Sequence, residues 1–243
     1  MRGVFERFLT EADMQRVRAC LATLRRHGVA EWALTGGIAI ELRLIERDGQ
    51  VEFRSLNDLD FVTSSFDAVP NTLGTEFLVG HVHPFDPPDK IIAQFVSSEL
   101  ALRINAFRTH PEVMNRASVV QTEFGTVHTV SLNDLVGRAA RLALPLADGQ
   151  PVLSKHAGDF LRLLKVANLE GAEQTWPQHR RVGNPESFQK AATLLRELIL
   201  RNSDLLKTPT YSQSVSNHCS RCANVKGLEL ANREIILSAL GYC

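Results

Sequence analysis

Cysteine and long apolar runs are both scarce in this sequence. Four cysteines in 243 residues are too few for a secreted scaffold held together by disulfides. No run of 18 apolar residues suggests a membrane span, and the N-terminal segment lacks the apolar core of a signal peptide. We therefore expect a cytoplasmic protein that has no membrane partner.

An excess of charge of one sign is also absent. The 27 lysines and arginines balance 27 aspartates and glutamates, so no overall basic field attracts nucleic acid, although a local patch is not excluded. The chain has no internal repeat and no low-complexity tract. With 44% hydrophobic and 22% charged residues, the composition is typical of a globular protein with a substantial core.

The hydrophobic pattern divides the chain into two parts. Up to about residue 130 it alternates between helical and strand periodicity, and after that it is helical. Helices are expected at 11–27, 38–46, 131–144, 152–169, 186–201 and 228–240, and strands at 32–35, 51–53, 59–63, 91–96, 100–107 and 127–130. We predict an α/β (α+β) fold, in which residues 1–130 form a mixed sheet flanked by helices and residues 131–243 form a helical C-terminal region.

A glycine pair follows the first predicted strand. Thr35 ends that strand, and Gly36 and Gly37 precede the second predicted helix. Glycine permits a sharp turn from strand to helix, and it leaves backbone N–H groups free to bind phosphate at the start of the helix. A glycine pair alone is often an ordinary turn, so this pattern needs a second signal nearby.

The second signal is a pair of carboxylates on a predicted strand. Asp58 and Asp60 alternate with Leu59 and Phe61, so both carboxylates lie on one face of the strand. Paired carboxylate oxygens suit a divalent cation such as Mg²⁺, with Mn²⁺ as an alternative. A solvated edge strand is the simpler explanation of an Asp-x-Asp pattern alone. The order of the glycine pair and the carboxylates, between apolar strands, favours phosphoryl chemistry.

Gly36-Gly37, a helix and then Asp58-x-Asp60 on a strand resemble the signature of the nucleotidyltransferase superfamily related to DNA polymerase beta. The local form is most similar to the AbiEii group of abortive-infection toxins, and the resemblance covers about residues 30–168. It is carried by Arg54 before the aspartates, Phe61 after them, Ser131-Leu132-Asn133-Asp134-Leu135 and Lys155-x3-Asp159-Phe160.

The resemblance implies a metal-dependent enzyme that moves an NMP from an NTP to an acceptor hydroxyl. It implies that the glycine pair binds the phosphates, that the aspartates hold two magnesium ions, and that a third carboxylate lies on a later strand. The acceptor would be a tRNA, a protein or a small molecule. A role as the toxin of a toxin–antitoxin pair, with an antitoxin as partner, also follows from the resemblance.

The sequence departs from this pattern at two positions. Asn105 stands where the third carboxylate is expected, and an amide cannot take a proton from the acceptor hydroxyl. Ala139 stands where a lysine is expected, with Arg138 and Arg141 beside it. These departures favour either weaker magnesium binding than in the family or a catalytically silent nucleotide-binding or regulatory protein of the same fold.

The predicted site therefore consists of residues from four segments. Arg103 shares a strand face with Asn105, and Lys155 is either a site lysine or a surface partner of Asp159. The predicted catalytic residues are Asp58, Asp60 and Asn105, of which Asp58 and Asp60 hold metal. The predicted nucleotide-binding residues are Thr35, Gly36, Gly37, Arg103 and Lys155.

Three other features have simpler interpretations. A zinc site formed by His218, Cys219, Cys222 and Cys243 is an alternative to free thiols, because only one Cys-x-x-Cys is present. The histidines at 81, 83 and 110 are expected at the surface. Trp176, in a polar stretch, is expected to be exposed.

Overall fold

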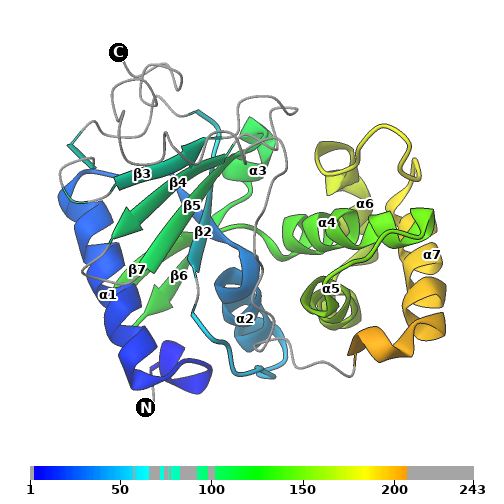
Figure 1. The fold of residues 1–243 in the computed structure, drawn as a ribbon, viewed down its shortest axis with the longest axis horizontal. Coiled ribbons are helices and arrows are strands. Elements are labelled where there is room, and N and C mark those ends of the chain that lie inside the picture. Colours follow the sequence, from blue (N-terminus) through cyan, green and yellow to red (C-terminus); the bar gives the residue numbers. More distant parts are fainter. Residues whose placement is uncertain are drawn as a thin grey trace.

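The computed structural model describes residues 3–56, 58–65, 72–73, 76, 78–82, 92–97 and 102–206. It contains a mixed sheet flanked by helices, followed by a group of helices packed to one side (Figure 1). The predicted fold class is thereby confirmed. None of the helices in the described ranges is both long and apolar enough to cross a membrane.

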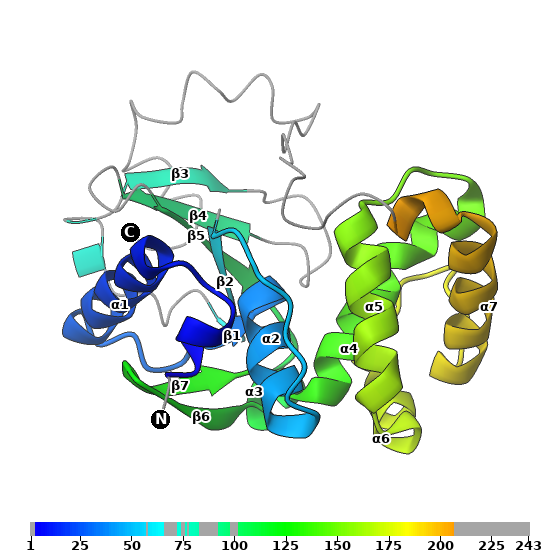
Figure 2. The same cartoon turned by 90° about the horizontal axis from the view of Figure 1, so that it is seen from below.

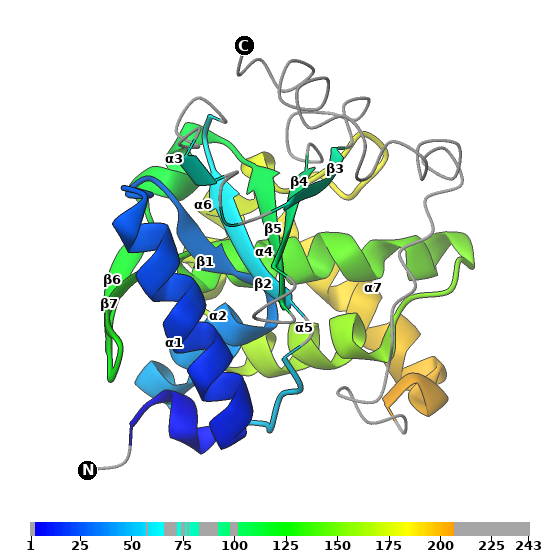
Figure 3. The same cartoon turned by 60° about the vertical axis from the view of Figure 1, so that its left-hand side comes forward.

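The sheet has seven strands in the order β3-β4-β5-β2-β1-β7-β6. The pairs β2–β5 and β1–β7 are parallel, and the other neighbouring pairs are antiparallel. Figure 3 shows the β6–β7 hairpin at one edge and β3 at the other. The strands are β1 (Ala33–Thr35), β2 (Asp58–Thr63), β3 (Leu78–Val82), β4 (Ile92–Ser97), β5 (Leu102–Arg108), β6 (Ser118–Thr122) and β7 (Gly125–Thr129).

The helices of the first part begin where the sequence offers a cap or a turn. Helix α1 (Glu11–Arg26) begins after Thr10, whose hydroxyl accepts a hydrogen bond from the N–H of Asp13. Helix α2 (Gly36–Arg47) follows β1 directly, so it begins two residues before the predicted start. The short helix α3 (Pro111–Asn115) has proline at its first position, where no N–H is needed.

The second part is a bundle of helices. These are α4 (Leu132–Ala143), α5 (Ser154–Val166), α6 (Leu169–Thr175) and α7 (Phe188–Arg201). Side chains of Ser131, Asn168 and Ser187 accept hydrogen bonds from N–H groups in the first turns of α4, α6 and α7, which fixes where these helices start. Helix α2 lies between the sheet and α5, so it connects the two parts (Figure 2).

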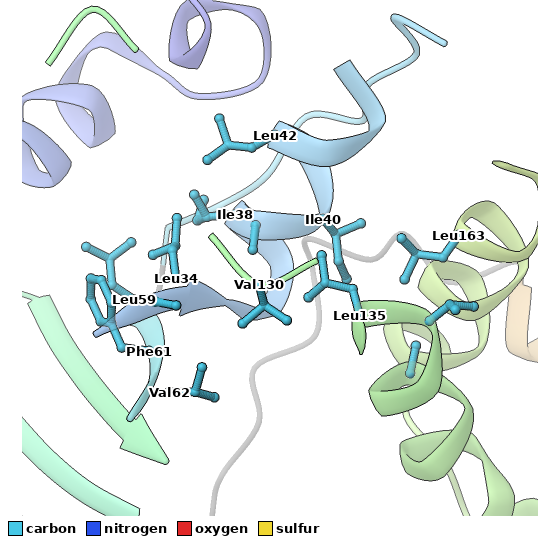
Figure 4. Close-up of a cluster of buried hydrophobic side chains, with 14 of the residues drawn as sticks. Leu34, Ile38, Ile40, Leu42, Leu59, Phe61, Val62, Val130, Leu135 and Leu163 are labelled. Carbon is cyan, nitrogen blue, oxygen red and sulfur yellow. The ribbon is translucent and has the colours of Figure 1, made fainter. Parts of the chain in front are cut away.

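A continuous hydrophobic core extends across the two parts. Leu34 of β1 and Leu59 of β2 point to the face of the sheet that α2 covers. Ile40 of α2, Leu135 of α4 and Leu163 of α5 belong to the same cluster (Figure 4), and each is at most 6% exposed. Burial of one such side chain contributes about 1.5–3 kcal/mol, so this cluster holds the helices against the sheet.

A buried ion cluster joins α2 and α5 as well. Arg54, in the segment before β2, donates to Glu41 of α2 over 2.7 Å and pairs with Asp159 of α5. Arg162 of α5 donates to both oxygens of the same Glu41, at 2.6 and 2.8 Å. Glu41 is fully buried, and Arg54 and Asp159 are nearly so. Each charge therefore has a partner, as burial requires.

Two predictions about local structure are wrong. Residues 51–53 form no strand, because the N–H of Glu52 donates to the Glu41 carboxylate and the next segment bonds to Phe8 through Arg54. Trp176 is fully buried rather than exposed, because its ring packs edge-on against Phe188 and its Nε1 donates to a backbone carbonyl. The predicted helix at 228–240, the zinc-site residues and His83 lie outside the described residues.

Candidate active site

The two aspartates of β2 lie beside β5 in parallel register. Asp58 is opposite Arg103, and Asp60 is opposite Asn105. Because side chains on one face of a strand recur every second residue, all four side chains lie on one face of the sheet. The structure thus brings together the predicted catalytic residues and Arg103.

These four side chains form one hydrogen-bonded group. Arg103 Nη2 lies 3.0 Å from Asp58 Oδ2. Asn105 Nδ2 donates to Asp58 Oδ2 over 3.1 Å and to Asp60 Oδ1 over 2.7 Å. The amide nitrogen, rather than the amide oxygen, faces the carboxylates, so Asn105 acts here as a donor. No group of three or more His, Cys, Asp or Glu side chains in the described ranges is placed to hold a metal ion, and Asp58 and Asp60 are a group of two.

Gly36 brings the start of α2 against Asp60. Thr35, the last residue of β1, pairs with Asp60 across the antiparallel β1–β2 ladder. Gly36 has a φ of +67°, and a Cβ built on it would collide with the Asp60 carboxylate. The positive φ and the absent side chain both require glycine at this position. The glycine turn at the start of α2 is therefore in direct contact with the Asp60 carboxylate.

Gly37 has an ordinary backbone and a different neighbour. A Cβ at Gly37 would lie 3.6 Å from Nη1 of Arg54, the residue held between Glu41 and Asp159. The buried ion cluster therefore lies directly beneath the second residue of α2. Because Asp159 pairs with Arg54 and Arg162, its role in this structure is to hold α5 against α2 rather than to support Lys155.

Thr35 is the N-cap of α2, yet its side chain makes no capping hydrogen bond. Its hydroxyl is buried, with no hydrogen-bond partner in the described part of the chain, and the residue is 1% exposed. The unused hydroxyl and the first N–H groups of α2 are donors available to an anion.

Thr35 also lines a small pocket between the sheet and α4. The pocket residues are Thr35, Val62, Arg108, Thr109, Val113, Val130, Asp134, Arg138, Arg141, Gln178 and His179.

Three arginines give this pocket a positive charge. Arg108 is at the end of β5, and Arg138 and Arg141 are on α4. The Arg138 guanidinium lies 4.4 Å from the centre of the Phe107 ring, which holds it over the sheet. Arg141 is 6% exposed, so it is part of the pocket wall rather than a solvated surface residue. Ala139, which replaces the expected lysine, is buried in the core.

The surroundings alter the ionisation of Asp60 and of His156. Burial and the negative charge of Asp58 raise the pKa of Asp60 to about 6, against the opposing effect of Arg138, Asn105 and Lys155. Burial, together with the charges of Lys155 and Arg138, lowers the pKa of His156 to about 4. Lys155 is therefore close enough to Asp60 to favour its ionised form. At pH 7 the Asp60 carboxylate is mostly ionised and His156 is neutral.

One part of the pocket wall was not expected from the sequence. Asp134 is fully buried and accepts hydrogen bonds from Arg116, at 2.6 and 3.0 Å, and from Ser131. Its pKa is lowered by hydrogen bonds with His179 and Arg116, which outweigh the effect of burial. These residues come from segments far apart in the sequence, and only Ser131-x-x-Asp134 is a local signal, typical of a helix N-terminus.

No protein-family model and no curated protein matches the chain. Several solved structures resemble it, and two of them are matched over most of their length. JHP933 from Helicobacter pylori is 14% identical, with 82% of this chain and 94% of that chain covered and a TM-score of 0.38. An antigenic nucleotidyltransferase-like protein from Paracoccidioides brasiliensis is 15% identical, with 86% and 99% covered and a TM-score of 0.44.

Proposed function

We propose that the protein is a metal-dependent nucleotidyltransferase that moves an NMP from an NTP to an acceptor hydroxyl. The observation that carries this proposal is the contact between Gly36 and the Asp60 carboxylate. This contact places a helix N-terminus, which binds phosphate favourably, beside a pair of carboxylates, which bind a divalent cation favourably. The acceptor would be a tRNA, a protein or a small molecule.

The binding of the triphosphate is assigned to residues around the start of α2. The N–H groups of Gly36 and Gly37 and the hydroxyl of Thr35 would donate to phosphate oxygens. Arg138 and Lys155 would balance the remaining negative charge from the side of the helical region. Together these donors would hold the nucleotide in one orientation, with its α-phosphate toward Asp60.

The two carboxylates suit a magnesium ion because their donor atoms are oxygens, which Mg²⁺ prefers as ligands. Asp58 and Asp60 offer oxygen ligands on one strand face, and Mg²⁺ needs only one or two carboxylates when water and phosphate complete its coordination. When bound, the ion would neutralise charge that develops on the transferred phosphoryl group. Within this arrangement Asn105 would orient both carboxylates through its amide N–H groups.

Calorimetric titration of each NTP, with and without Mg²⁺, tests the proposal. The wild type should bind at least one NTP only when Mg²⁺ is present, and Asp58→Ala/Asp60→Ala should abolish this binding. Val119→Ser, an exposed position on β6, is the matched control and should bind as the wild type does. Failure of every NTP to bind would overturn the proposal.

A catalytically silent nucleotide-binding protein is the second candidate. The specific observation in its favour is that Asn105, at the position where the resemblance implies a carboxylate, hydrogen-bonds to both aspartates. Such a protein would bind an NTP with Mg²⁺ but would release no pyrophosphate with any acceptor. Pyrophosphate release in the presence of total tRNA, or of cell protein, would instead identify the enzyme and its class of acceptor.

The finer assignment, a cytoplasmic toxin countered by an antitoxin, rests on the resemblance in sequence alone. Expression of the wild type and of Asp58→Ala/Asp60→Ala from an inducible promoter tests it. A toxin of this kind should arrest growth only when both aspartates are present. Equal growth of both strains, with equal protein levels, would remove the toxin assignment and leave the nucleotide site unaffected.

A further inference from the structure

The carboxylate pair already has a cation of its own. Arg103 is opposite Asp58 in the β2–β5 ladder, and its Nη2 lies 3.0 Å from Asp58 Oδ2. Both side chains are about 30% exposed, so the ion pair lies at the open face of the sheet rather than in the core. The register of two paired strands fixes this contact, which therefore does not depend on a loop.

The hydrogen bonds occupy part of the coordinating capacity of the carboxylates. Asp58 Oδ2 accepts from both Arg103 and Asn105, and two donors use both lone pairs of a carboxylate oxygen. Asp60 Oδ1 accepts the second N–H of Asn105, and Asp60 Oδ2 lies toward the backbone of Gly36. What is left suits one cation, bound between Asp58 Oδ1 and Asp60. A second cation needs another carboxylate oxygen, and Asp58 Oδ2 is taken.

The charges around the pair also disfavour two cations. Asp58 and Asp60 carry two negative charges, of which Arg103 neutralises one. Arg138 and Lys155 add positive potential at Asp60. One divalent ion therefore makes the group slightly positive before a triphosphate binds, whereas a second would be repelled by the first and by three cationic side chains.

We propose that Asp58 and Asp60 hold one divalent cation and that the Arg103 guanidinium replaces the second cation of a two-metal site. This inference rests on the proposed function in one respect only: the divalent cation is taken to bind the triphosphate of an NTP. Arg103 then has two roles: it restrains Asp58, and it presents a fixed positive charge beside the place of phosphoryl transfer.

Mn²⁺ binding to the nucleotide-free protein, measured from the loss of the free Mn²⁺ signal in electron paramagnetic resonance, tests the inference. The wild type should bind one Mn²⁺ per chain. Arg103→Met/Asn105→Asp should bind two Mn²⁺ per chain. This double variant removes the Arg103 guanidinium and adds a carboxylate at position 105, beside Asp58 and Asp60. Arg103→Lys keeps the charge and should still bind one.

Arg18→Met is the matched control, because Arg18 is exposed on α1 and its loss leaves the site intact. It should bind one Mn²⁺. Two Mn²⁺ in the wild type, or none, would overturn the inference, as would a folded double variant that still binds one. If the double variant does not fold, the wild-type stoichiometry decides. NTP calorimetry is a separate measurement, so nucleotide binding with two Mn²⁺ refutes this inference alone.

Discussion

Gly36 shows how a single residue controls the site, because its backbone is left-handed and it touches the Asp60 carboxylate. Gly36→Ala should therefore be destabilising for two reasons. The left-handed backbone costs an alanine about 1–2 kcal/mol, and the new methyl group displaces the carboxylate. We expect divalent-cation affinity to fall on the order of tenfold, as when a group that orients a metal ligand is lost.

Gly149→Ala is the control for this prediction. Gly149 has the same φ of +67°, but a Cβ there meets nothing within 4 Å. Urea unfolding should show a similar backbone cost in both variants, and Mn²⁺ titration should show weakened binding only in Gly36→Ala. Equal Mn²⁺ affinities in the two variants would mean that contact with Gly36 does not position Asp60.

His156 should make the protein less stable in acid. Burial lowers its pKa in the folded state to about 4, whereas in the unfolded chain it is near 6.5. Between these values the unfolded chain binds a proton that the folded protein does not, so stability falls as the pH decreases through this window. The full effect, reached near pH 4, is up to about 3 kcal/mol.

Chemical denaturation of the wild type and His156→Gln at pH 7 and pH 4.5 measures this contribution. The variant should lose less stability between the two pH values, because glutamine does not titrate. Parallel losses in both proteins would show that His156 is accessible to protons in the folded state. His110→Gln, at an exposed histidine, should behave as the wild type does.

At the scale of elements, the buried ion cluster determines how α5 lies against α2. Arg54→Met would leave Arg162 as the remaining cationic partner of Glu41 among the described residues and would deprive Asp159 of its closest partner. Removal of one partner from a buried ion pair typically costs about 3–5 kcal/mol. Urea unfolding should show a loss of this size. Arg201→Met, which removes an exposed i,i+4 pair with Glu197, should cost less than about 0.5 kcal/mol.

The elements differ in how well the sequence predicted them. Hydrophobic periodicity correctly located α1, α4, α5 and α7 to within a few residues, because one face of each helix is buried. It failed at 51–53, where a short stretch of alternating apolar and polar residues bonds to a helix side chain instead of a strand. A pattern along one segment carries no information about a partner that lies elsewhere in the chain.

The site was partly accessible to sequence reasoning for a related reason. The turn at Gly36 and the pair Asp58 and Asp60 are local patterns, and the structure places them in contact. The two-residue period also put Arg103 and Asn105 on one face. That Arg103 pairs with Asp58 depends on the register between β2 and β5, which no short motif encodes. The pocket wall around Asp134 likewise required the fold.

At the scale of the whole molecule, the two parts should unfold together. Each contains one of the two tryptophans, both nearly or fully buried: Trp32 beside β1 and Trp176 after α6. Because the hydrophobic core is continuous between the parts, the fluorescence of Trp32→Phe and of Trp176→Phe should change over the same range of urea concentration. Two separated transitions in these single-tryptophan proteins would show that the helical region folds independently.

The strand that leads into the glycine turn is only three residues long, and its parallel neighbour is β7, where Leu34 pairs with Thr129. During synthesis on the ribosome, β1 can therefore pair only with β2 until β7 has emerged. Long-range parallel pairing of this kind slows folding and delays the ordering of the segments that depend on it. The turn at Gly36 and the carboxylates of β2 are thus synthesised before β7, the strand that completes the pairing of β1, and we expect the arrangement around Asp60 to become fixed only after β7 has paired.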